Sequence, residues 1–322
     1  MSTDDTINLL NRPVYELQEF TVEGQIVTLK EADKSQLGEM LSLVIDEQPF
    51  QFPRAIISRD VYGNPLVDRE QNTVYRFTTV YDAVDKFYVR LKSNDKNPIP
   101  ILCHQQHLEP VAMCRVCMVL VAGPEFDAKG KPKLGEKGEI IYGRESLAPA
   151  CHRTLDDHMK IFTPRHPAED KRKKMAKVSK IVLELLISDH GDPQAHNKLA
   201  DLPREEREMR PEFYTLLREQ GLPPIPRFPR ASAAVSRPID ESSFFIAVDH
   251  SSCILCDRCI RSCTDIKKNK IIGRTGSGYR TRISFDLDQP MGQSDCVECG
   301  ECAASCPTDA LTFKHVIEPE WD

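Results

Sequence analysis

The chain has 322 residues, of which 40% are hydrophobic, and it carries a net charge of -6 at pH 7. This length allows two or three small domains, and the negative charge argues against a nucleic-acid partner, because phosphate recognition requires a basic face. No run of about 18 apolar residues occurs, so no membrane-spanning helix is expected. The basic run Lys171–Lys174 is interpreted as the solvated face of a helix.

Twelve cysteines are the most informative feature of the composition. In a secreted protein they would suggest disulfides, but Met1–Leu10 lacks the charged and then apolar pattern of a signal peptide. The cysteines are therefore expected to be metal ligands in a reducing compartment. The expected localisation is cytoplasmic.

In chain order, residues 1–13 are interpreted as a disordered or partner-wrapping leader. Phe20–Leu29 alternates apolar and polar residues, which predicts a β-hairpin. In a β-grasp ferredoxin such a hairpin is followed directly by a helix, whereas here the first helix is expected at Val80–Leu91, with Thr79 as its N-cap. Residues 30–77 are thus interpreted as an insertion, whose aromatic residues could form a small core or a docking surface.

The next feature is a group of cysteines that could supply the four thiolates of a [2Fe-2S] cluster. They are Cys103, Cys114, Cys117 and Cys151. Their C-x10-C-x2-C spacing differs from the plant-type C-x4-C-x2-C spacing. The stretch Gly123–Gly143, rich in glycine, lysine and proline, predicts a hairpin extension between the last two ligands.

Three histidines flank these cysteines, namely His104, His107 and His152. A Rieske centre would need two histidines in place of two cysteines, and four cysteines are already present. The histidines are therefore assigned to the surroundings of the cluster or to the surface.

A helix is expected at Lys173–Ser188, where apolar residues recur at helical spacing. Residues 204–220 are also helix-prone, highly charged and interrupted by Pro211. The proline-rich residues 221–243 then predict a stiff connector, which leads to a strand at Phe244–Asp249.

The C-terminal part carries two matching C-x2-C-x2-C-x3-C runs. The first run is Cys253, Cys256, Cys259 and Cys263, and the second is Cys296, Cys299, Cys302 and Cys306, followed by Pro307. This is the spacing of a two-cluster, bacterial-type ferredoxin, in which the last cysteine of each run completes the other run's [4Fe-4S] cluster. Cluster A is assigned to Cys253, Cys256, Cys259 and Cys306, and cluster B to Cys263, Cys296, Cys299 and Cys302.

Zinc is the competing interpretation of these runs. Structural zinc sites usually pair two C-x2-4-C elements and have no use for the additional cysteines. The number of cysteines also agrees with iron–sulfur clusters, because four for the [2Fe-2S] site and eight for the two [4Fe-4S] sites account for all twelve. Gly273–Gly278, between the two runs, is interpreted as a loop or hairpin insertion and not as a dinucleotide-binding fingerprint.

Over roughly residues 78–315 this order of modules resembles the small diaphorase subunit of NAD-linked [NiFe] hydrogenases. It is also similar to the accessory region of [FeFe]-hydrogenases and NAD-linked formate dehydrogenases, and to the start of the large iron–sulfur subunit of respiratory complex I. Pro149–His152 followed by Asp157–Thr163 looks like the family's fourth-ligand segment. The resemblance thus implies Cys103, Cys114, Cys117 and Cys151 as [2Fe-2S] ligands.

One departure from the family pattern is specific. The helical segment of the family normally carries H-x3-C-x2-C-x5-C, which binds a further [4Fe-4S] cluster. Aligned from His190, the three cysteine positions fall on Gln194, Asn197 and Pro203. Amide and proline side chains cannot replace thiolates, so the resemblance implies that this cluster is missing while its helical scaffold remains.

The predicted fold class is α+β, with three domains: a β-grasp [2Fe-2S] ferredoxin domain, a small helical domain and a two-cluster [4Fe-4S] ferredoxin domain. The expected boundaries are 1–13 for the leader, 14–165 for the β-grasp domain with insertions at about 30–77 and 123–146, 166–220 for the helical domain with its degenerate site for one histidine and three cysteine ligands, 221–243 for the linker and 244–322 for the second ferredoxin domain.

A non-catalytic electron-transfer subunit is the expected function. It would pass single electrons between a flavoprotein (diaphorase-like) subunit linked to NAD(P)H and a catalytic redox subunit, using one [2Fe-2S] and two [4Fe-4S] clusters. A self-contained enzyme would need a large catalytic domain, and the chain ends soon after Cys306 without one. The alternatives are an accessory domain of a hydrogenase or formate dehydrogenase and an iron–sulfur redox sensor, although no signalling module is visible. The terminal substrate and the direction of electron flow stay open.

Overall fold

The computed structural model describes residues 19–22, 25–28, 39–59, 64–67, 71, 73–91, 96–190, 212–222, 228 and 238–314. The predicted leader, most of the linker, and the positions Gln194, Asn197 and Pro203 lie outside the described residues.

The chain divides into two compact units. The first consists of Met1–Ile99 with Cys117–Ala176, and the second of Pro100–Val116 with Lys177–Asp322. The predicted boundaries after residues 165 and 243 do not coincide with this division. Residues 100–116, expected in the [2Fe-2S] domain, instead pack in one hydrophobic core with the helical segment and the first ferredoxin run.

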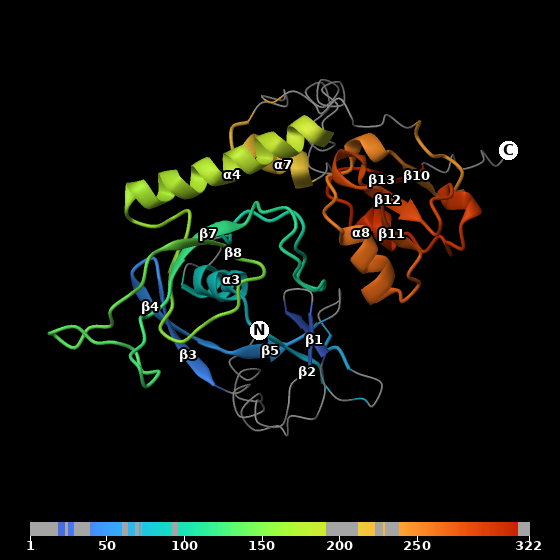
Figure 1. The fold of residues 1–322 in the computed structure, drawn as a ribbon. Coiled ribbons are helices and arrows are strands. Elements are labelled where there is room, and N and C mark those ends of the chain that lie inside the picture. The colour runs from blue at the N-terminus through green and yellow to red at the C-terminus, as the bar shows by residue number, and fades with distance from the viewer. Residues whose placement is uncertain are drawn as a thin grey trace. The chain divides into compact units, whose positions relative to one another are not determined.

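A five-stranded sheet with the order β4-β3-β9-β7-β8 forms the first unit. Its strands are β3 (Met40–Ile45), β4 (Gln48–Pro53), β7 (Met118–Ala122), β8 (Ser146–Pro149) and β9 (Lys160–Phe162). β3 pairs antiparallel with β4 and parallel with β9. Helix α3 (Val80–Leu91) lies beside this sheet (Figure 1). Phe87 of α3 meets Phe50 of β4 edge to face, with 5.4 Å between ring centroids.

Two short antiparallel hairpins accompany the sheet. They are β1 (Glu19–Val22) with β2 (Gln25–Thr28), and β5 (Ala55–Ile57) with β6 (Tyr75–Phe77). The hairpin predicted at Phe20–Leu29 therefore forms, but as a separate two-stranded sheet. The hairpin that joins the main sheet is β3–β4, which lies within residues 30–77, the segment interpreted as an insertion.

The predicted helix at Val80–Leu91 is confirmed, and so is its cap. The Thr79 Oγ1 accepts a hydrogen bond from the Asp82 main-chain N–H, and the Asp82 carboxylate accepts from the Thr79 N–H at 2.8 Å. This reciprocal pair satisfies two donors that the first helical turn leaves open. Arg76 holds the same carboxylate with two hydrogen bonds of 2.6 and 2.7 Å.

Between β7 and β8 the chain runs out and back as a long extension. Isolated bridges join Pro124 to Tyr142, Phe126 to Pro132, and Leu134 to Ile140. The segment 123–146 thus has the form of a hairpin extension of two neighbouring strands.

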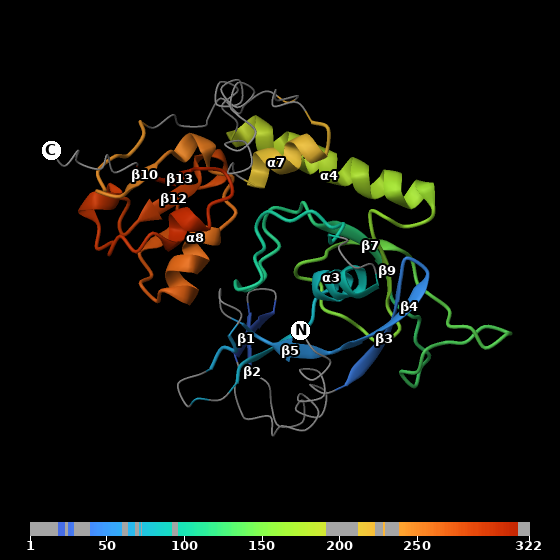
Figure 2. The same cartoon turned by 180° about the vertical axis from the view of Figure 1, so that it is seen from behind.

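Helix α4 (Glu169–His190) contains the predicted helix and extends it at both ends, and α7 (Glu212–Glu219) begins directly after Pro211. Leu183 and Ile187 of α4 share a core with Phe213 and Leu217 of α7. Both views show α7 beside this part of α4 (Figure 2). Among the described residues, no helix combines the length and the apolar character needed to cross a membrane.

The ferredoxin part of the second unit has two antiparallel strand pairs, β10 (Ile246–Val248) with β13 (Leu311–Phe313), and β11 (Ile272–Thr275) with β12 (Arg282–Phe285). Its short helices are α8 (Arg258–Arg261) and α9 (Glu301–Ala304), with single turns at His250–Ser252, Ser262–Ile266, Gly278–Arg280 and Met291–Gln293. The stretch Gly273–Gly278 lies in the β11–β12 hairpin, which is one of the two forms expected for it. Gly276 is required there, because its φ is +80° and a Cβ atom would lie 2.4 Å from the Arg280 carbonyl oxygen.

The two cysteine runs follow the same backbone path. Leu255 and Glu298 occupy equivalent positions and have φ angles of 53° and 52°, and the next equivalent pair, Asp257 and Gly300, has 61° and 77°. The left-handed backbone conformation costs free energy in a residue that has a Cβ atom, so its repetition indicates a geometry that both runs need. The sequence repeat is thus also a structural repeat.

Candidate iron–sulfur centres

The two ferredoxin runs place their cysteines at loops and short helices around one core. Cys259 lies in α8 and Cys302 in α9, and the same core contains Cys253 and Cys263. Of the eight cysteines, five are buried and Cys296 and Cys306 are partly buried. Cys299 is exposed.

Four of these thiols are difficult to ionise, namely those of Cys253, Cys256, Cys259 and Cys302. Burial raises the pKa of the Cys253, Cys256 and Cys302 thiols to about 12, and nearby cysteine sulfurs add to the rise. The pKa of Cys259 is also raised well above its ordinary value by burial and by the surrounding cysteines. Thiols that are so costly to ionise together fit a site where iron supplies the compensating positive charge.

Main-chain N–H groups point at several of the sulfurs. The Ile271 N–H donates to Cys263 Sγ at 3.4 Å, and the Glu298 N–H donates to Cys296 Sγ at 3.4 Å. Such donors stabilise negative charge on sulfur and are one means by which a protein sets a cluster's potential. The donor set and its surroundings therefore fit two [4Fe-4S] clusters. No group of three or more His, Cys, Asp or Glu side chains in the described part of the chain is arranged to hold a single metal ion.

The other four cysteines form two close pairs, one in each unit. In the second unit, the Cys103 N–H donates to Cys114 Sγ at 3.4 Å and the Cys114 N–H donates to Cys103 Sγ at 3.5 Å. In the first unit, Cys117 Sγ and Cys151 Sγ are 3.4 Å apart. All four are buried, and only two residues separate Cys114 from Cys117 in the chain. That the four ligate one [2Fe-2S] cluster stays a prediction.

Residues 100–116, here called the ligand loop, are anchored in the second unit. Leu102, Cys103, Cys114 and Val116 share a hydrophobic core with α4, α7 and the residues Ile254 and Cys256 of the first ferredoxin run. A candidate [2Fe-2S] ligand and a candidate [4Fe-4S] ligand thus belong to one packed core. Spacing alone did not reveal this, because nothing in the cysteine pattern says which segment packs against the loop.

The three flanking histidines have different surroundings. His104 is buried, and its main-chain carbonyl accepts a hydrogen bond from Arg258 at 3.1 Å. His107 and His152 are partly buried. His104 therefore lies within the packed surroundings of the ligand loop and not on the surface.

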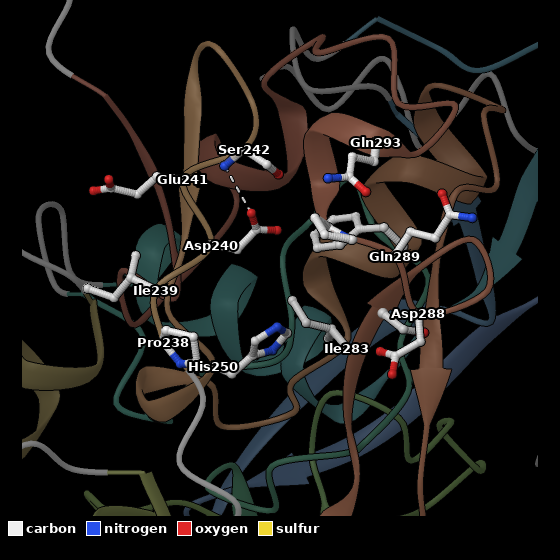
Figure 3. Close-up of a pocket in the computed structure, with 13 residues that line it drawn as sticks. Pro238, Ile239, Asp240, Glu241, Ser242, His250, Ile283, Asp288, Gln289 and Gln293 are labelled. Carbon is white, nitrogen blue, oxygen red and sulfur yellow. Dashed lines mark hydrogen bonds between the residues drawn. The ribbon is translucent and has the colours of Figure 1, made fainter.

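The ferredoxin part also holds a cavity of about 430 Å³ whose lining contains none of the candidate cluster cysteines. Asp240, Ser242, His250 and Gln293 are among its lining residues (Figure 3). The Asp240 carboxylate accepts hydrogen bonds from the main-chain N–H groups of Ser242 and Met291, at 2.9 and 2.7 Å. The cavity is thus bordered by contacts that hold the β10 and β12 sides of the domain together.

Residues 252–310 match the family described as "4Fe-4S dicluster domain". The fold is a mixed α/β fold that contains this iron–sulfur dicluster domain. The chain is also similar in sequence to proteins named as formate dehydrogenases.

Two provisionally named formate dehydrogenases illustrate the relationship. The chain is 26% identical over 225 residues to one from Staphylococcus haemolyticus (strain JCSC1435), and 25% identical over 227 residues to one from Staphylococcus aureus (strain USA300). In each case the match covers 69% of this chain and 18% of the relative. The chain thus matches less than a fifth of the length of these relatives.

A solved structure shares the fold. A chain in the crystal structure of NAD+-reducing [NiFe]-hydrogenase in the H2-reduced state superposes with a TM-score of 0.56. The match covers 86% of this chain and 88% of that chain, at 18% identity. The likeness therefore concerns the arrangement of the backbone.

Proposed function

We propose that this chain is a non-catalytic electron-relay subunit of a multisubunit redox enzyme. It passes single electrons between a flavoprotein (diaphorase-like) subunit linked to NAD(P)H and a catalytic redox subunit. The observation that carries this proposal is the shared core of the ligand loop and the first ferredoxin run, which includes Cys103, Cys114 and Cys256. Bound iron–sulfur clusters supply one-electron redox chemistry at these ligands.

The first unit is proposed to be a β-grasp [2Fe-2S] domain. The β3–β4 hairpin, α3, and the strands β7, β8 and β9 in a sheet with a parallel β3–β9 pair support this assignment. Cys103, Cys114, Cys117 and Cys151 are the proposed ligands. Cys117 directly precedes β7 and Cys151 follows β8, so paired strands position these two residues.

The end of the relay that meets the catalytic subunit is proposed to be cluster B. Its ligand Cys299 is exposed. Two exposed apolar residues lie near it: Val297 is two positions before it in the chain, and Phe313 is close in space. Phe313 is placed by Gly300, since a Cβ atom there would be 2.8 Å from the Phe313 ring. An apolar surface around an exposed thiolate ligand suits contact with another redox protein, because it excludes water from the contact.

Iron content tests the proposed cofactors. Anaerobically purified protein is expected to hold about ten irons, from one [2Fe-2S] and two [4Fe-4S] clusters. Iron and sulfide analysis with EPR of the reduced protein measures this. About fourteen irons would show a fourth cluster near His190, and about eight without a [2Fe-2S] signal would refute the assignment of the first four cysteines.

A second candidate is that the segment serves as an accessory region of a longer hydrogenase or formate dehydrogenase. The observation in its favour is that the match occupies only 18% of its formate dehydrogenase relatives. Purification from native cells distinguishes the two. A chain that co-purifies with separate flavin-binding and catalytic chains supports the subunit, and one polypeptide of several times this mass supports the accessory region.

A further inference from the structure

The structural repeat in the ferredoxin part is broken by two arginines. In α8 and α9 the ligands Cys259 and Cys302 are equivalent, but Arg258 is matched by Glu301 and Arg261 by Ala304. Both arginines are buried, with 1% and 6% of their surface exposed. Cluster ligation does not require them, because the second run provides the same cysteine spacing without them.

Arg258 is held by a carboxylate. Its guanidinium makes two hydrogen bonds to Glu212 of α7, at 2.8 and 2.7 Å, and a third to the His104 carbonyl. This is the bidentate geometry that makes a buried arginine tolerable. Arg258 therefore serves to fasten α7 and the ligand loop to α8.

Arg261 has a different set of partners. Its guanidinium donates to the main-chain carbonyls of Cys103, of Glu109 at 2.8 Å, and of Cys256 at 3.4 Å. Two of these three carbonyls belong to candidate ligands, one of the [2Fe-2S] cluster and one of cluster A. A single side chain thus bridges the ligand loop and the first ferredoxin run.

The guanidinium of Arg261 interacts electrostatically with candidate ligands and with one carboxylate. Burial lowers the pKa of its guanidinium, while the sulfurs of Cys103 and Cys256 and the carboxylate of Asp257 counteract that effect. Its hydrogen bonds are to carbonyls, which carry no net charge, so the negative groups that act on it are the sulfurs of Cys103 and Cys256 and the carboxylate of Asp257. A guanidinium remains protonated under such conditions.

We propose that Arg261 is a positioning residue that ties the [2Fe-2S] ligand loop to cluster A and sets the reduction potentials of both centres. The inference rests on the proposed function. A fixed positive charge favours reduction of a nearby centre, since reduction adds negative charge, and its influence falls with distance. Arg261 therefore raises the potentials of the [2Fe-2S] cluster and of cluster A, and affects cluster B less.

The test is an EPR-monitored redox titration of the intact, iron-loaded protein and of the variants Arg261→Gln and Arg261→Lys. In R261Q the [2Fe-2S] potential and one of the two [4Fe-4S] potentials are expected to shift downward, and the other [4Fe-4S] potential is expected to shift less. In R261K, which keeps the charge, both shifts are expected to be smaller. The matched control is Arg282→Gln, because Arg282 pairs with Asp288 and contacts no candidate ligand among its described partners.

Unchanged potentials in R261Q, or equal shifts in R261Q and R282Q, would overturn the inference. They would leave the proposed function intact, provided that the wild-type protein holds about ten irons. If R261Q does not retain its clusters, Arg261→His replaces it. The potentials of R261H are then expected to fall more steeply with rising pH than those of the wild type, and identical pH profiles would refute the role of the charge.

Discussion

Cys299 is the only exposed cysteine among the candidate cluster ligands, all of which lie in the described part of the chain. Replacing it with alanine is expected to remove cluster B alone and to lower the iron content from about ten to about six. Iron analysis and EPR of Cys299→Ala measure this, and Val297→Ala, two positions away, serves as the control. Loss of all clusters, or a full complement of iron with an unchanged spectrum, would contradict the ligand assignment.

The cysteines and the arginines differ in how readily the sequence reveals them. The cysteine spacing encodes a ligand set directly, because the chemistry of a cluster fixes the residue type and the interval. The contacts of Arg258 and Arg261 with the ligand loop join residues 154 and 152 positions apart and end on main-chain carbonyls. Every residue has such a carbonyl, so these contacts leave no pattern in the sequence.

At the level of elements, the β3–β4 hairpin shows why sequence reasoning did not find it. Its turn consists of Asp46 and Glu47, with φ angles of 47° and 69°, whereas tight hairpin turns usually carry glycine at such positions. Asp46 is held by other contacts, since its carboxylate accepts hydrogen bonds from Tyr88 at 2.6 Å and from the Thr163 N–H at 2.7 Å. Tertiary contacts therefore fix a turn that has no local signal.

The α3 N-terminus, by contrast, was predictable because its cap is local. Burial raises the pKa of the Asp82 carboxyl, but Arg76 and the hydrogen bonds from Thr79 outweigh burial and hold that pKa below its ordinary value. Asp82→Asn is expected to lower the free energy of unfolding at pH 7 by about 1–3 kcal/mol. Chemical denaturation followed by circular dichroism measures the difference.

The sign of the pH dependence follows from the lowered pKa. The stabilisation by ionised Asp82 is fully present above the pKa of the unfolded chain and is lost as pH falls through the lower pKa of the folded state. The difference between wild type and D82N should therefore shrink in acid. Asp85→Asn is the matched control, because burial raises the pKa of Asp85 and neutralising it is expected to cost little at pH 7. An equal loss in both variants would contradict the role of the cap.

At the scale of the whole molecule, the order of the cysteine motifs predicted the dicluster domain, but not the division into units. The ligand loop was assigned with its neighbours in the sequence, whereas its apolar residues pack with α4, α7 and Ile254. Amphipathic patterns show that a segment buries one face, and leave open what covers that face. The segments that pack against the ligand loop could therefore be identified only from the tertiary structure.

The purified chain alone is expected to be catalytically silent toward NAD(P)H, hydrogen and formate, while its clusters accept electrons from a strong reductant. The reason is that the candidate sites consist of cysteine ligands for electron carriers, and such carriers need a partner to bind and convert a substrate. Spectrophotometric assays with an artificial electron acceptor measure turnover. Turnover by the chain free of other subunits would contradict the relay proposal.

The antiparallel pairing of β10 with β13 joins the first strand of the ferredoxin part to its last. The polypeptide consequently enters and leaves this domain at the same edge, with Ile246 opposite Phe313. A domain whose two ends lie side by side can be inserted into a longer polypeptide without distorting the structure on either side of the insertion point. The geometry of the dicluster domain therefore allows it to be inserted as a unit into proteins of very different length.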